Sequence, residues 1–186
     1  MRSVISPGGL DAVIRWWERG VQLFLCVSVV LIGVGGIEKL VTHHAIYQPK
    51  DLMMAQYSIP FCVALSIYFD PTDPESFDEK KLKDKRILAM MRKVKLKVDH
   101  EIEHKGWDRA ARVTIDLGKK QRHSALVIHF KGTPKNPLSQ LEVRDKACKL
   151  TREMLPERQL ERLVETVDNL ENIDDVSCIG QLLQSQ

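Results

Sequence analysis

The stretch Ala55-Gln56-Tyr57-Ser58-Ile59-Pro60-Phe61-Cys62-Val63-Ala64 decides the fold of the middle of this chain. Pro60 suits the first turn of a helix, where its missing N–H breaks no hydrogen bond. Ser58 can cap the same turn with its hydroxyl. Because nearly every residue from Pro60 to Phe69 is apolar, the stretch predicts an apolar helix over residues 60–69.

On the C-terminal side of this helix the hydrophobic period changes from helix to strand. Asp78 can cap a helix expected over residues 79–92. Alternating apolar residues then predict three strands, marked by Val94, Leu96 and Val98, by Val113, Ile115 and Leu117, and by Leu126, Ile128 and Phe130. Residues 118–123 form a hairpin turn between the last two. After Pro137 two apolar stripes predict helices over 138–155 and 157–171, separated by Pro156. The sequence therefore predicts an α+β fold, an antiparallel sheet with flanking helices followed by an all-helical C-terminal tail.

The N-terminal side contains the least ordinary segment, because residues 20–36 carry no charge. A short helix is expected over residues 10–17 before it. The run is slightly shorter than the roughly 20 residues that a membrane-spanning helix needs. Three interpretations remain: a membrane anchor, a buried β element, or an insertion. We favour the insertion, with the anchor second. Residues 37–43 then predict a strand.

The composition is that of a soluble globular protein, with 44% hydrophobic and 28% charged residues in 186. A net charge of +3 and the absence of a nucleic-acid-binding motif argue against a nucleic-acid partner. The four cysteines show neither a CxxC pair nor zinc-ligand spacing. We expect reduced thiols in a reducing compartment, the cytoplasm or the mitochondrial matrix. The alternative is a membrane location through residues 20–36.

The chain resembles the C-terminal portion of the MmgE/PrpD family in three places taken in order. These are residues 55–64, the stretch 131–139 (KGTPKNPLS), and the amphipathic tail that ends near residues 174–176. The family includes 2-methylcitrate dehydratase, cis-aconitate decarboxylase and iminodisuccinate epimerase. The resemblance implies a lyase or isomerase of small di- or tricarboxylates that abstracts a proton next to a carboxylate, without a metal or other cofactor.

The resemblance also implies a domain division and a site. Residues 37–136 correspond to the family's lid domain, and residues 137–186 correspond to helices that pack on its helical domain; residues 1–36 stand apart. A tyrosine of the family's cleft corresponds to Phe61, which lacks the hydroxyl, and Tyr57 lies one turn earlier. These two are the candidate catalytic residues, and the candidate substrate-binding residues are His43, Lys131 and Lys135.

The resemblance covers the lid and the closing helices, with little of the helical domain. We therefore expect a truncated member or fragment that is inactive alone. It would act as a homo-oligomer or together with a helical domain. The alternative is a non-catalytic interaction module, an orphan lid that pairs with another chain.

The segment His100-Glu101-Ile102-Glu103-His104 matches the HExxH pattern of zinc peptidases. In those enzymes both histidines share one helix face. Here the segment follows an alternating strand directly and precedes Lys105-Gly106. In a strand, residues four apart lie about 13 Å from each other, too far for one zinc ion. We expect a strand end and loop that bind no metal.

Overall fold

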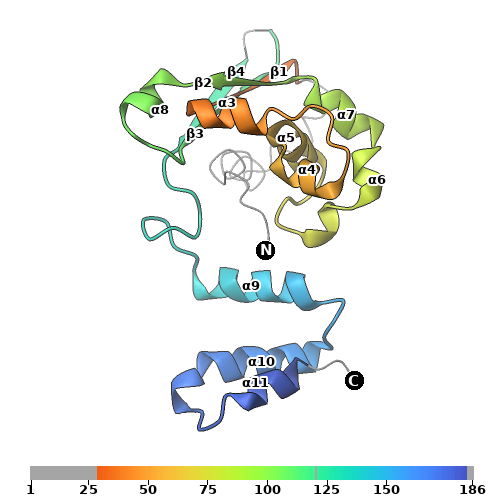
Figure 1. The fold of residues 1–186 in the computed structure, drawn as a ribbon, viewed down its shortest axis with the longest axis vertical. Coiled ribbons are helices and arrows are strands. Elements are labelled where there is room, and N and C mark those ends of the chain that lie inside the picture. Colours follow the sequence, from red (N-terminus) through yellow and green to blue (C-terminus); the bar gives the residue numbers. More distant parts are fainter. Residues whose placement is uncertain (1–28, 120, 184–186) are drawn as a thin grey trace. The chain divides into compact units, whose positions relative to one another are not determined.

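The computed structural model describes residues 29–119 and 121–183. The chain divides into two compact units, the first ending at Pro137 and the second beginning at Leu138. The expected helix over residues 10–17 and the first part of the apolar run lie outside the described residues. Figure 1 shows the elements of both units.

The first unit contains a four-stranded sheet in the order β2-β1-β3-β4. Its strands are β1 (Leu31–Gly36), β2 (Val94–Val98), β3 (Ala111–Asp116) and β4 (Arg122–Val127). β3 pairs antiparallel with both β1 and β4, whereas β1 and β2 are parallel. The α+β prediction is confirmed, and the sheet is antiparallel except for one pair.

The parallel pair requires a long crossover, because parallel strands cannot be joined by a tight turn. The crossover consists of five α-helices and a 3-10 turn. They are α3 (Glu38–His44), α4 (Leu52–Tyr57), α5 (Ile59–Tyr68), η1 (Pro74–Ser76), α6 (Glu79–Leu82) and α7 (Lys85–Met91). Figure 1 shows α3, α4 and α5 together on one side of the sheet.

Helix α5 lies at the centre of the core and is buried on all sides. Every residue from Ile59 to Ile67 is buried, and the helix packs against α4, α7 and β2. The core continues onto the inward sheet face through Ile32, Val34, Val94, Val113, Ile115 and Val127. The apolar helix predicted over residues 60–69 is confirmed, with Pro60 in its first turn and Ser58 as its cap.

The interpretation of the apolar run as an insertion is wrong for residues 31–36. They form β1, which lies between β2 and β3, so removing them would break both pairings. The glycines permit close packing here. A Cβ on Gly36 would lie 2.7 Å from Leu40 Cδ1, and one on Gly35 would lie 3.1 Å from Asp99 Oδ2. Across residues 29–119 and 121–183, we find no helix with the length and apolar character to cross a membrane.

Three further local predictions are corrected. Residues 38–44 form helix α3 instead of a strand, since Ile37, Leu40 and Val41 fit the i, i+3, i+4 spacing of a helix as well as they fit alternation. The helix expected over 79–92 is divided in two, because Asp84 caps a second start by accepting the Arg86 N–H. HEIEH forms a one-turn helix, α8 (His100–His104), instead of a loop.

The second unit is helical, with α9 (Gln140–Thr151), α10 (Glu157–Asp168), η2 (Leu170–Asn172) and α11 (Ser177–Leu182). Ser139 and Glu142 form a capping box at the start of α9. Helix α10 packs against α9 and α11. The predicted helical tail is confirmed, and α9 buries none of its residues.

Candidate functional site

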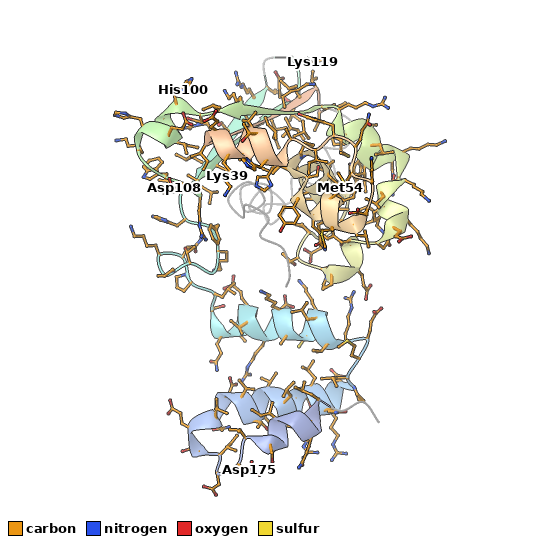
Figure 2. The ribbon with its side chains drawn as sticks, viewed as in Figure 1. Lys39, Met54, His100, Asp108, Lys119 and Asp175 are labelled. Atoms are coloured by element: carbon orange, nitrogen blue, oxygen red, sulfur yellow. The ribbon has the colours of Figure 1, made fainter. Side chains whose placement is uncertain are left out.

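The end of α3 meets the junction of α4 and α5, and this α3–α4 edge places a histidine against a tyrosine. The His44 Nδ1 atom lies 3.0 Å from the backbone oxygen of Tyr57. The two rings are parallel, with centroids 6.2 Å apart. His44 is half-buried, and Tyr57 is 41% exposed. Figure 2 labels Lys39 on α3 and Met54 on α4, the two helices that meet here.

A buried serine fixes this junction. The Ser58 hydroxyl accepts a hydrogen bond from the Phe61 N–H at 3.0 Å and donates one to the Ile46 carbonyl at 2.5 Å. Ser58 therefore caps α5 and also holds the segment that follows α3. Tyr47 ties the same segment to the sheet, because its hydroxyl donates to the Val94 carbonyl at 3.0 Å. These bonds hold His44 and Tyr57 in a defined geometry.

The predicted candidates occupy three different surroundings. Tyr57 lies on the α3–α4 edge, whereas Phe61 is completely buried against Phe77, with ring centroids 6.3 Å apart. His43 is exposed at the end of α3, and its Nδ1 lies 2.8 Å from the Thr42 hydroxyl. Sequence reasoning missed His44. Its spacing from Leu40, four residues earlier on one helix face, was the available signal.

Lys131 and Lys135 belong to a separate structured loop that follows β4. The Gly132 N–H donates to the Asn136 carbonyl at 2.8 Å, and Gly132 adopts a φ of 89° that favours glycine. The Asn136 side chain donates to the His129 carbonyl at 2.9 Å. Both lysines are exposed. The loop therefore presents two cations from a defined backbone.

Helix α8 uses the glutamates of HEIEH in structural contacts. The Glu101 carboxylate accepts a hydrogen bond from Arg112 at 2.6 Å, and Glu103 accepts the Glu38 N–H at the start of α3 at 3.1 Å. Ile102 is buried, and His100 is exposed. The part of the chain that the structure describes contains no group of three or more potential metal ligands.

Asp99 organises the start of α8. Its carboxylate accepts the Glu101 and Ile102 N–H groups and pairs with Arg112 at 2.8 Å. Burial raises the pKa of Asp99, but the hydrogen bonds from Arg112 and the Ile102 N–H outweigh this effect, so its pKa lies below the usual value. The bond to Asp99 raises the pKa of Arg112. This network stabilises the sheet end, and Figure 2 shows that His100 lies on α8, away from Met54 on α4.

These elements define a class of protein: an α+β domain with a polar edge over a buried helix, followed by a helical unit. The profile of the MmgE/PrpD C-terminal domain matches residues 26–172. The chain therefore belongs to the MmgE/PrpD family, and the expected resemblance is confirmed. No curated protein matches the chain.

Proposed function

We propose that this chain supplies one wall of an active-site cleft for a lyase or isomerase of small di- or tricarboxylates. Family membership supports the class of chemistry. The observation that carries the proposal is the α3–α4 edge, where His44 and Tyr57 present an imidazole and a phenol from a rigid junction. Both groups exchange protons or form directional hydrogen bonds, as proton abstraction next to a carboxylate requires.

The proposed site combines this edge with cationic side chains. Tyr57 and His43 lie on or beside the edge, and Lys131 and Lys135 offer charge for substrate carboxylates. Phe61 contributes no hydroxyl and is buried, so its role is packing beneath the edge. Proton abstraction and leaving-group departure need a base and an acid on opposite sides of a closed cleft. We therefore infer that a second wall completes the site.

Calorimetric titration of the purified full chain tests this proposal. Citrate should bind saturably, whereas its neutral trimethyl ester should not, because the ester lacks the charges that the lysines attract. Lys131→Gln and Lys135→Gln should each weaken binding. The matched control is Lys119→Gln, since Lys119 is also exposed but lies in the β3–β4 hairpin. Equal binding of ester and acid, or equal effects of all three variants, would contradict the proposal.

A turnover assay tests the requirement for a second wall. The purified chain should convert neither 2-methylcitrate nor cis-aconitate above a heat-killed control. Activity should appear when the helical domain of a family member is added. Turnover by the chain alone would show that this chain holds both the acid and the base.

The second candidate function is an interaction module, and exposed apolar side chains on α9 favour it. Leu141 is 77% exposed and Val143 is 50% exposed. We propose that this helix packs on another copy or on a helical domain, because it buries none of its own residues and carries exposed leucine and valine side chains. Leu141→Ser should reduce concentration-dependent association in sedimentation experiments. Val30→Ser is the control, since Val30 is 58% exposed in the first unit. A monomeric wild-type chain at high concentration would refute packing of α9 on another copy.

A further inference from the structure

The hydrogen bond between His44 and Tyr57 fixes the tautomer of the imidazole. A backbone carbonyl oxygen only accepts hydrogen bonds, so the His44 Nδ1 atom must carry the proton that it donates across 3.0 Å. In the neutral ring, Nε2 then holds the lone pair and acts as an acceptor. Within residues 29–119 and 121–183, no hydrogen bond to Nε2 is present, so this atom is the one that the ring offers to a ligand.

The ring is also held in orientation. It lies parallel to the Tyr57 ring, and Ser58 joins the end of α4 to the segment after α3 through the Ile46 carbonyl. An acceptor fixed in this way discriminates between ligands that have a donor at the matching position and ligands that lack one. A site built to bond a ligand hydroxyl rejects the analogue without it, because a polar group is then left unpaired.

We propose that His44, held by Tyr57, is a specificity-determining residue whose Nε2 accepts a hydrogen bond from the hydroxyl group of a hydroxy-carboxylate. This inference rests on the proposed function, because it assumes that the ligand is a carboxylate bound at the proposed site. Comparing citrate with tricarballylate isolates the contribution of the ligand hydroxyl, since both have three carboxylates and only citrate has the hydroxyl. One neutral hydrogen bond corresponds to a preference for citrate of about two- to twelvefold.

The experiment compares both ligands on the full-length wild type, His44→Asn and His104→Gln by calorimetry. Asparagine keeps a donor near the position of Nδ1 and removes Nε2, so the preference for citrate should fall to about onefold. His104 is exposed on α8, and its variant should keep the wild-type preference. Long-range proton–nitrogen NMR of the wild type should show the His44 proton on Nδ1. Citrate should shift the Nε2 resonance more than tricarballylate does.

The outcomes separate the two proposals. Equal affinity of the wild type for both ligands, a preference that persists in His44→Asn, or a proton on Nε2 would overturn the role of His44 and leave the carboxylate site standing. Failure of both ligands to bind would overturn the proposed function as well as the inference drawn from it.

Discussion

Replacing Ser58 with alanine should destabilise the first unit more than any other serine-to-alanine change on α5. The hydroxyl is fully buried, caps α5 at the Phe61 N–H and satisfies the Ile46 carbonyl. Loss of an N-cap costs about 0.5–2 kcal/mol. An unpaired buried acceptor costs about 1–3 kcal/mol more. The free energy of unfolding should therefore fall by about 1.5–5 kcal/mol.

Urea unfolding followed by intrinsic fluorescence measures this change. Trp107 and the three tyrosines are described residues of the first unit, so their emission reports on its unfolding. Ser66→Ala is the control, because Ser66 is buried on the same helix but only donates to the Val63 carbonyl one turn earlier. It should cost less than about 1 kcal/mol, since alanine is the better helix former. Equal costs for the two variants would refute the role given to the Ser58 junction.

Three further predictions concern acid, thiols and metal. The hydrogen bonds from Arg86 hold the pKa of Asp84 at about 2, so the stability that it contributes is present above about pH 4 and is lost as the pH falls towards 2. Asp84→Asn should flatten this part of the pH dependence of the unfolding free energy. An unchanged slope would contradict a stabilising role for the Asp84–Arg86 ion pair. Burial raises the pKa of Cys62 to about 12. A thiol reagent at pH 8 should therefore label the exposed Cys148 and leave Cys62 unmodified until the chain unfolds. Peptide mass spectrometry measures the order of labelling, and modification of Cys62 before Cys148 would contradict the prediction. HEIEH should bind no zinc, and metal analysis showing one equivalent that is lost in His100→Ala would contradict this.

The elements that sequence reasoning predicts well have one unambiguous period. Val94 to Val98 alternates strictly and is a strand, and the apolar run after Pro60 is a buried helix. β1 contains three glycines and no alternation of polar and apolar residues. Its assignment as a strand therefore depends on its pairing with β2 and β3, not on a local sequence pattern. Residues 37–44 contain too few apolar positions to separate the two periods. Those assignments depend on contacts that are distant in sequence.

The geometry of the candidate site also depends on contacts between residues that are distant in sequence. The sequence singles out Tyr57, which lies at a helix end, but the orientation of its carbonyl towards His44 depends on the loop between α3 and α4. The role of Glu103 in holding the first N–H of α3 joins residues far apart in the chain. Neither contact has a local sequence signal, because side-chain partners across a crossover are set by tertiary packing.

The position of β1 has a consequence for how the chain acquires its structure. β1 is an inner strand, yet both of its partners come much later in the chain, as the pairs Ile32↔Val94 and Ile32↔Ile115 show. During synthesis β1 is made before either partner, while the crossover helices are still to come. Long-range pairings of this kind are slow to form, because the entropy of a long loop must be lost before any contact is gained. We expect the helices of the crossover to assemble around α5 first and the sheet to close last, when β2 and β3 enclose β1.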